Sequence, residues 1–547
     1  MQQTLSDPFY YLDNFQRALD WVVQRHPHLL SDEEHAFAKH FPSLPRPARA
    51  LLVRMVMRKG DLFRASKLRY PEIGCSRAAS TPLIACGWVD ARPALDIERL
   101  FALLTKPELA TVFALAPSDA ALAKPQLLET LRVLHPHARA FDAWWPDSDD
   151  CVFRLRVDAL CERLRLLFFG NGHQDWSEFV LAELGIVRYE KVELTAHAFG
   201  FRCRADVETW LLIRDCRERL EQGEAPHVVL AQVPATISDN AWLESRRARL
   251  LFAIGQQQER AGELEAALAT YAGCGHPGAR VRRIRMLELL GRHAEACAQA
   301  LAAATEPESE AERQQLARML PRLRRKAGLH KVAAPTAAPI ERIGVVLPIP
   351  ANGMSVELAL AAYLTRPDAP VRYVENTLLN ALFGLLCWEA VFAPVPGAFF
   401  HPFQAGPADL HSPDFHARRA QAFARCLEQL DSDAWRATIN RNYAEKSGIA
   451  SPFVAWEAID ETLIGLALDC IPPAHLKACF TRMLFDVRSN CNGLPDLIQF
   501  HPAERRYRMI EVKGPGDRLQ DNQIRWLEHF AAHGIPASVC HVSWEPA

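Results

Sequence analysis

The sequence predicts a multidomain protein whose N-terminal and middle regions are mainly α-helical and whose C-terminal region is a small α/β domain. Three observations support this fold class. Long stretches before residue 330 place apolar residues at helical spacing. The segment 331–340 has two prolines and no apolar period, and it is the clearest linker. After it, near the end of the chain, two strand-like segments, a helix-like segment and a further strand follow one another. A chain of 547 residues accommodates three or four domains of roughly 100–200 residues each.

Residues 1–75 are predicted to form a helical DNA-binding domain. Helices are expected at 15–23, 33–40 and 48–57. A cluster of basic residues with interleaved aromatic side chains follows, which is typical of a surface that contacts phosphates. The basic residues predicted to bind DNA are Arg54, Arg58, Lys59, Arg64 and Lys67. The alternative is an ordinary solvated basic face.

The middle of the chain is predicted to be helical in two parts. Residues 76–150 form the first part, and residues 151–330 form a long arginine-rich tract that begins with a helix at 152–167. From about residue 241 the helices pair, 246–261 with 263–271 and 281–290 with 293–303. The pairs resemble tetratricopeptide-type repeats, which stack into a curved scaffold.

The motif with the clearest chemistry lies in the last domain, residues 341–547. Gly-Leu-Pro-Asp ends at Asp496, and Glu511-Val512-Lys513 follows after fourteen residues. Strands at 496–500 and 506–513 form a hairpin that brings Asp496 close to Glu511. Glu511 and Lys513 share one face because side chains alternate along a strand. Two carboxylates and an ammonium group at one end of a sheet indicate metal-dependent phosphodiester hydrolysis. The alternative is a surface hairpin with ordinary charged residues.

Each charged group in this motif has a role in metal-dependent phosphodiester hydrolysis. Carboxylate oxygens are the ligands that Mg²⁺ prefers, and a bound divalent ion lowers the pKa of its water. Lys513 can orient that water or stabilise the charge that develops on the phosphate. A helix at 517–533 and a strand at 537–543 follow, with Gln523 on the helix face that packs on the sheet. The order β-β-α-β with acids on the first two strands is that of restriction-endonuclease-like cores.

Three stretches carry a resemblance to a known family. GLPDLIQF…RMIEVKGPGDRLQDNQIRWL resembles the VRR-NUC (virus-type replication-repair nuclease) domain of the PD-(D/E)xK nuclease superfamily. YVEN at 373–376 leads into LFGLLCWE, and KLRYPEI stands at 67–73. Together they make the whole chain resemble a bacterial member of the Fanconi-associated nuclease family. This resemblance implies a SAP-like DNA-binding domain at 76–150.

The resemblance also implies a set of site residues. It makes Glu375, in the first turn of a helix expected at 372–392, the third acid, with Glu389 as the rival. The implied metal ligands for Mg²⁺ or Mn²⁺ are Glu375, Asp496, Glu511 and the carbonyl of Val512. The implied catalytic residues are Lys513 and Gln523. Arg488, before the Gly-Leu-Pro-Asp turn, is expected to bind a DNA 5′ phosphate, and Arg518 is a second phosphate-facing cation. Relatives have a basic residue where this chain has Asn522.

The function implied by the resemblance is that of a structure-specific nuclease. It would act on branched DNA as a 5′-flap endonuclease and 5′-to-3′ exonuclease in interstrand crosslink repair. The residues alone indicate metal-dependent hydrolysis of a nucleic acid. One alternative is a junction-resolving or restriction-type nuclease, although the long helical arm favours a monomer that grips one DNA arm. Another is a non-catalytic DNA-binding scaffold.

The cysteine pattern, the first residues and the most apolar run indicate the cellular compartment of the protein. The fourteen cysteines contain no CxxC pair and are expected to be reduced thiols. The first residues lack the charged start and apolar core of a signal peptide. The most apolar run, 377–392, is too short to span a bilayer. We therefore expect a soluble intracellular protein, cytoplasmic in a bacterium, with no membrane partner.

Overall fold

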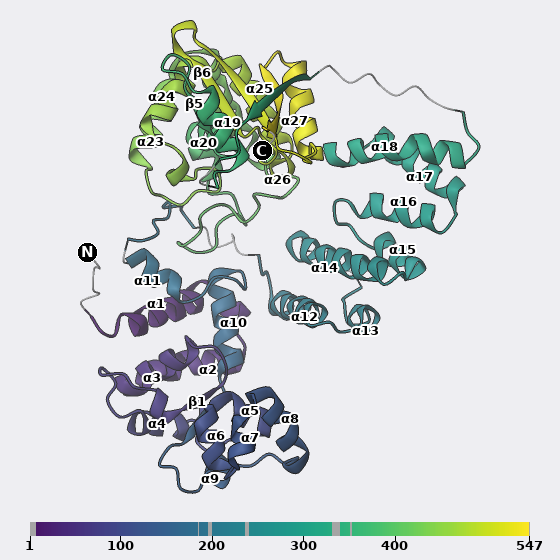
Figure 1. The fold of residues 1–547 in the computed structure, drawn as a ribbon. Helices are drawn as coiled ribbons and strands as arrows, with labels where there is room; N and C mark the ends of the chain where they lie inside the picture. The colour runs from purple at the N-terminus through teal and green to yellow at the C-terminus, as the bar shows by residue number, and fades with distance from the viewer. Residues whose placement is uncertain are drawn as a thin grey trace. The chain divides into compact units, whose positions relative to one another are not determined.

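The structure is a computed structural model, and it describes residues 7–183, 185–194, 200–235, 240–330, 340–350 and 353–545. It divides into two compact units, residues 1–187 and residues 188–547. The predicted fold class is confirmed, because helices dominate both units up to residue 330 and a mixed sheet stands in the C-terminal region (Figure 1). The predicted linker 331–340 lies outside the described residues except for Ile340.

The first unit opens with three helices that match the prediction. They are α1 (Tyr10–Arg25), α2 (Asp32–His40) and α3 (Arg46–Val56). A capping box begins α2, in which the Glu34 N–H donates to Ser31 Oγ and the Ser31 N–H donates to the Glu34 carboxylate. The other helices of this unit are α4 (Ser76–Ala85), α5 (Ile97–Leu103), α6 (Lys106–Val112), α7 (Pro117–Ala121), α8 (Lys124–Leu134), α9 (Phe141–Trp144), α10 (Asp158–Phe169) and α11 (Ser177–Glu183).

A small antiparallel sheet in this unit was not predicted. Its strands are β1 (Leu62–Arg64), β2 (Val89–Asp90) and β3 (Val152–Leu155), in the order β1-β3-β2. The predicted helix at 152–167 is therefore wrong in its first part, where β3 precedes α10. Strands of two to four residues are too short to show the alternating pattern that identifies a strand in a sequence.

The second unit begins with the helical tract. Its helices are α12 (Arg204–Glu221), α13 (Pro226–Leu230), α14 (Ala241–Arg260), α15 (Leu264–Ala272), α16 (Ala279–Leu289), α17 (His293–Thr305) and α18 (Glu310–Lys326). From α14 to α18 each helix packs against the next, as the repeat-like pattern predicts (Figure 1). Gly255 of α14 allows Tyr271 of α15 to pack closely, since a Cβ at Gly255 would lie 2.6 Å from the Tyr271 ring.

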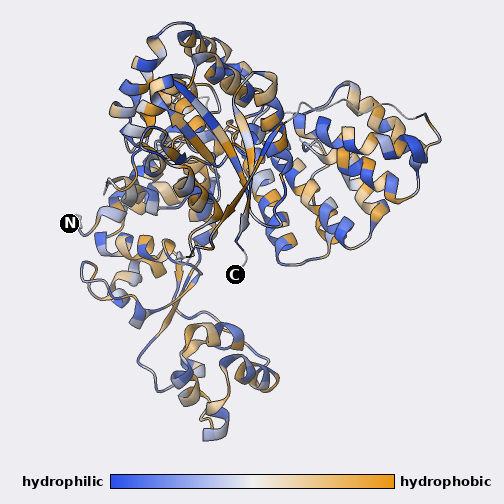
Figure 2. Cartoon of the chain, turned by 45° about the horizontal axis from the view of Figure 1, so that its top comes forward, coloured by the Kyte–Doolittle hydropathy of each residue, from blue (hydrophilic) through white to orange (hydrophobic). Residues whose placement is uncertain are grey.

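The C-terminal region is built on a five-stranded sheet in the order β4-β8-β7-β6-β5. The strands are β4 (Glu341–Leu347), β5 (Val371–Tyr373), β6 (Leu497–His501), β7 (Arg506–Lys513) and β8 (Ala537–Trp544). β8 runs parallel to β4 and β7, whereas β6 is antiparallel to β5 and β7. The helices are α19 (Val356–Leu364), α20 (Leu378–Leu386), α21 (Trp388–Val391), α22 (Ala420–Glu428), α23 (Ala434–Glu445), α24 (Glu461–Cys470), α25 (Pro473–Phe485), α26 (Val487–Asn490) and α27 (Asp521–Ala532). The strands carry both apolar and polar residues along their length (Figure 2).

The predicted helix at 372–392 is wrong in its first turn. Residues up to Tyr373 form β5, and the helical part is divided between α20 and α21. Tyr373 pairs with Leu497 of β6, and the Val374 N–H donates to the Asp496 carbonyl at 2.8 Å. Pairing with a distant strand therefore outweighs the local helical period. Glu375 lies in the connection between β5 and α20.

Two further findings concern membranes and thiols. No single helix in the described ranges has the length and apolar composition required to cross a bilayer. Helices α24 and α25 meet that requirement only as a pair, and they are bent by 108° at the break between them. All fourteen cysteines fall within the described residues, and all are free thiols.

Candidate active site

The Asp496–Glu511–Lys513 group predicted from the sequence is assembled at the junction of β6 and β7. Leu497 pairs with Ile510, which sets Asp496 opposite Glu511 across the hairpin. Asp496 Oδ2 accepts a hydrogen bond from the Val512 N–H at 2.7 Å. Lys513 Nζ lies 2.7 Å from Glu511 Oε1. All three charged side chains are buried, Glu511 most deeply at 1% exposed.

Burial and mutual repulsion perturb the two carboxyl groups. Burial raises the pKa of Asp496 to about 6, and the Glu375 charge adds to this against the opposing effects of the Val512 N–H and Lys513. Burial raises the pKa of Glu511 to about 7, with a further contribution from Asp496. One ammonium group does not compensate the carboxylates gathered here, and perturbed titration of this kind is typical of a functional site.

The residues present fit a divalent cation. Apart from the ion pair with Lys513, neither Glu511 carboxylate oxygen has a hydrogen-bond partner among the described residues. Buried oxygens with unused lone pairs and excess negative charge are what a hard cation binds. In the same described part of the chain, no three His, Cys, Asp or Glu side chains converge closely enough to form a complete metal site. Asp496 and Glu511 thus supply two ligands, and a third must come from nearby.

Two glutamates stand close enough to affect these carboxylates. The charge of Glu375 raises the pKa of both Asp496 and Glu511. The charge of Glu357, in the first turn of α19, raises the pKa of Asp496. Sequence reasoning missed Glu357, because nothing in its spacing relates it to a motif some 140 residues away. The rival acid Glu389 lies in α21 and lines a different hollow, together with Lys191.

Two other predicted residues lie after β7. Gln523 is in the first turn of α27, where its Oε1 accepts a hydrogen bond from the Gln520 N–H at 2.8 Å. The side chain therefore caps the helix, and its catalytic role stays a prediction. Arg518 is exposed in the turn between β7 and α27. Asn522 packs against the Gly-Leu-Pro-Asp turn, since a Cβ at Gly493 would lie 2.6 Å from its side chain.

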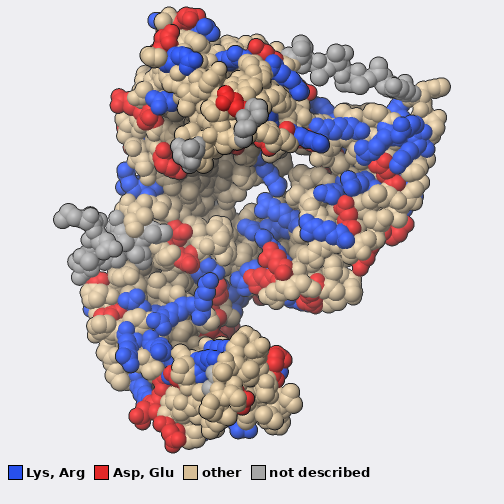
Figure 3. All heavy atoms as spheres, in the orientation of Figure 1, with Lys and Arg blue, Asp and Glu red and all other residues tan. Residues whose placement is uncertain are grey.

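Arg488 lies near a group of basic residues that the sequence did not reveal. It is exposed on α26, and its charge acts on Arg249 of α14 and on two histidines, His276 and His411. Burial first, and then the charge of Arg488, lowers the pKa of Arg249. The same two causes lower the pKa of His276 and of His411. Figure 3 shows Lys and Arg side chains gathered over the helical tract. Cations that repel one another at one place favour an anion between them.

The predicted basic cluster of the first unit divides into two classes. Arg58, Lys59 and Lys67 are exposed. Arg54 Nη2 lies 2.7 Å from Glu72, and its guanidinium stacks on the Tyr11 ring.

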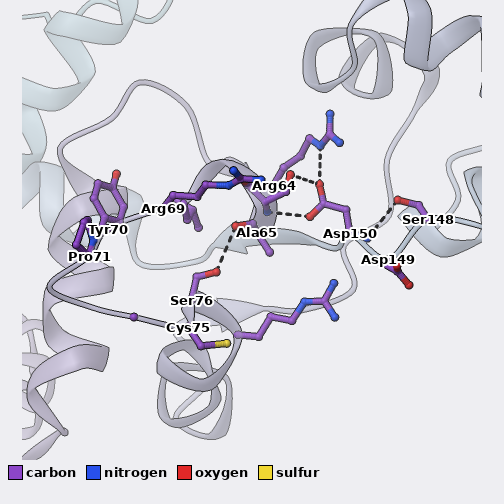
Figure 4. A pocket seen from close by; sticks show the side chains of 14 residues that line it. Arg64, Ala65, Arg69, Tyr70, Pro71, Cys75, Ser76, Ser148, Asp149 and Asp150 are labelled. Carbon is purple, nitrogen blue, oxygen red and sulfur yellow. Dashed lines mark hydrogen bonds and ion pairs between the residues drawn. The ribbon is translucent and has the colours of Figure 1, made fainter.

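Arg64 is buried, and two acids within the unit neutralise its charge. Its Nε donates to Asp150 at 2.8 Å and its Nη1 donates to Glu108 at 2.6 Å. Figure 4 shows the Asp150 side chain receiving Arg64 at the wall of a hollow of about 770 Å³. These ion pairs give Arg64 a structural role within the unit, and its DNA-binding role stays a prediction.

Comparisons with known proteins place this site in a class. A model of the VRR-NUC domain matches residues 431–544, which include Asp496, Glu511 and Lys513. Models described as "FAN1, HTH domain" and "Fanconi anemia-associated nuclease SAP domain" match residues 9–90 and 94–144. The chain is therefore a nuclease of the class that hydrolyses phosphodiester bonds, and this class is generally dependent on divalent metals.

The family follows from the relatives that match the whole chain. A Fanconi-associated nuclease 1 homolog of Pseudomonas aeruginosa is 53% identical over 99% of this chain and 97% of its own. A homolog of the same name in Arabidopsis thaliana is 24% identical over 97% of this chain and 67% of its own. The crystal structure of paFAN1 bound to 2nt 5′ flap DNA with gap superposes with a TM-score of 0.96, at 52% identity and full coverage of both chains. This chain belongs to the Fanconi-associated nuclease family.

Proposed function

We propose that this protein is a structure-specific DNA nuclease that cuts branched DNA next to a 5′ flap and trims DNA from the 5′ end. The observation that carries the proposal is the buried Asp496–Glu511–Lys513 group, in a chain similar throughout to a nuclease solved with 5′ flap DNA. Helical regions rich in basic residues suit this task, because phosphate contacts position a duplex without reading its bases.

The roles at the carboxylates follow from their chemistry. Asp496, Glu511, the carbonyl of Val512 and Glu375 would hold Mg²⁺ or Mn²⁺. The ion, when bound, lowers the pKa of a water and shields the phosphate charge. Lys513 is held 2.7 Å from Glu511 and directs its ammonium group toward the attacking water or the phosphate oxygens. Gln523 steadies Lys513 or the phosphate from the start of α27.

The guanidinium groups of Arg488 and Arg249, with the neutral imidazole of His276 as a hydrogen-bond donor beside them, bind the 5′ phosphate of the flap strand. Arg249 and His276 reach this place from the helical tract, and Arg488 reaches it from α26. A terminal phosphate carries more charge than an internal one, so it gains most from several converging cations. Arg518, Arg58, Lys59 and Lys67 contact the DNA backbone elsewhere, where the charge of each acts without regard to base sequence.

The biological role that we propose is the repair of interstrand crosslinks, supported by the family to which the chain belongs. The Pseudomonas aeruginosa relative and the DNA substrate support a place in the bacterial cytoplasm.

The test is cleavage of an end-labelled 5′-flap DNA with Mn²⁺, comparing the wild type with Asp496→Ala. We expect the wild type to cut near the branch point and the variant to bind the DNA without cutting it. Asp368→Ala is the matched control, because Asp368 is an exposed aspartate of the same domain. A four-way junction is tested in parallel. Faster cutting of the junction than of the flap favours a junction-resolving enzyme, and equal cutting by the wild type and Asp496→Ala refutes the proposed centre.

A further inference from the structure

Glu375 lies between two hydrogen-bond donors that flank it closely in the chain. The Tyr373 hydroxyl donates to Glu375 Oε2 at 2.5 Å, and Asn376 Nδ2 donates to Glu375 Oε1 at 3.3 Å. A carboxylate offers about four lone-pair positions. The two donors therefore fix the direction of the carboxylate and leave positions free for a cation.

Asn376 also ties this segment to the turn that carries Asp496. Its Oδ1 accepts a hydrogen bond from the Leu494 N–H at 3.1 Å. Asn380 reinforces the link, since its Nδ2 donates to the carbonyls of Asn376 at 2.8 Å and of Cys491 at 2.9 Å. Asn376 has a φ of +50°, a backbone conformation that L residues rarely adopt. Such a conformation persists where surrounding contacts determine it.

Tyr373 reaches Glu375 from the end of β5. The strand is fixed at this point because Tyr373 pairs with Leu497, the residue after Asp496. A tyrosine hydroxyl is protonated at neutral pH and can therefore donate a hydrogen bond to a carboxylate. Tyr373 is 46% exposed, so it contributes little to the packed core.

We propose that Tyr373 and Asn376 are positioning residues that hold Glu375 in the orientation in which it joins Asp496 and Glu511 around a divalent cation. This inference rests on the proposed function and deepens it. It explains how an acid outside the hairpin becomes a ligand, although its segment is neither strand nor helix. Residues that orient metal ligands in this way typically change metal affinity by about 10–100-fold when they are replaced.

The first experiment measures Mn²⁺ binding to the full chain by titration calorimetry and by the electron paramagnetic resonance of free Mn²⁺. Tyr373→Phe removes the hydroxyl and keeps the ring. We expect the dissociation constant for Mn²⁺ to rise by about tenfold or more. Tyr363→Phe is the matched control, since Tyr363 of α19 is 51% exposed and its hydroxyl makes no hydrogen bond to any described residue. Its Mn²⁺ affinity should equal that of the wild type.

A second variant tests the other donor. Asn376→Gly retains the left-handed backbone without steric cost and deletes both side-chain hydrogen bonds. We expect a similar loss of Mn²⁺ affinity. In cleavage assays, both variants should be slowest at low Mn²⁺ and should recover as Mn²⁺ is raised, with an unchanged KM for flap DNA.

The outcomes separate this inference from the function on which it rests. Unchanged Mn²⁺ affinity in both Tyr373→Phe and Asn376→Gly, with normal binding by the wild type, overturns the positioning role alone. A raised KM for DNA with unchanged Mn²⁺ affinity also overturns it, because the hydroxyl would then touch DNA. A wild type that binds no Mn²⁺ overturns the proposed metal site and this inference with it.

Discussion

Replacing Arg64 with methionine tests whether this arginine stabilises the fold or binds DNA. The substitution leaves Asp150, which is 7% exposed on its side chain, without its ion-pair partner, and it also removes the partner of Glu108. Breaking a buried ion pair costs about 3–5 kcal/mol. Asp150 keeps hydrogen bonds from the Ser66 N–H at 2.9 Å and from the Ser66 hydroxyl, so the lower figure of about 3 kcal/mol applies.

For a unit of this size, about 3 kcal/mol lowers Tm by roughly 6–12 °C. Thermal unfolding followed by circular dichroism measures this shift, and fluorescence anisotropy at 20 °C without divalent ions measures DNA affinity. Arg58→Met is the matched control, since Arg58 is exposed on the same part of the chain. We expect Arg64→Met to lose stability and keep its DNA affinity, and Arg58→Met to do the reverse. A stable Arg64→Met protein that binds DNA weakly would show that the reasoning from burial is wrong.

Four other predictions concern the site and its surroundings. Lys513→Met should lower kcat about 10²–10³-fold with unchanged DNA affinity in filter binding, because the ammonium group acts on charge that develops during the reaction. Arg488→Ala should reduce the preference for a 5′-phosphorylated over a 5′-hydroxyl flap about tenfold, measured as a ratio of dissociation constants. Gly493→Ala should lower the unfolding free energy in urea by about 1–3 kcal/mol, because Gly493 has a φ of +84° and its new Cβ would meet Asn522. Burial, and the charges of His28 and Arg25, lower the pKa of His26 to about 4. Because the unfolded chain therefore takes up a proton below pH 6.5 before the folded protein does, the unfolding free energy in urea should fall between pH 6.5 and pH 4. This fall should be larger in the wild type than in His26→Gln, by up to about 3 kcal/mol.

The hairpin was predictable because its signals are local. The strand predicted at 506–513 is β7 with the same ends, since alternating apolar residues and a preceding polar turn define it. The helices of the tract were predictable for the same reason, as apolar residues recur at helical spacing within each. Asp496, Glu511 and Lys513 are close in sequence and lie on adjacent strands, so strand geometry alone brings them together.

The features that the sequence did not predict depend on partners far away in the chain. Arg64 has the sequence context of a surface cation, but its charge is matched by Asp150, 86 residues further on. The segment around Glu375 has the apolar period of a helix, but its first residues pair with β6 and form a strand. Arg249 and His276 resemble the many other basic residues of the helical tract, and only the fold distinguishes them by bringing Arg488 to them.

Contacts between the helical tract and the nuclease core support the proposal that Arg249 and Arg488 act together with the carboxylates. Arg482 of α25 is buried and lies 2.5 Å from Glu310 at the start of α18. Arg318 of α18 lies 2.6 Å from Asp521 at the start of α27, the helix that also carries Gln523. A buried ion pair resists rearrangement, because separating it exposes each partner to the full cost of an unpaired buried charge. The buried pair fixes the start of α18 to α25, and the exposed pair adds a contact between α18 and α27. These contacts support the proposal that the scaffold, and not the sequence of bases, determines where the DNA strand is cut.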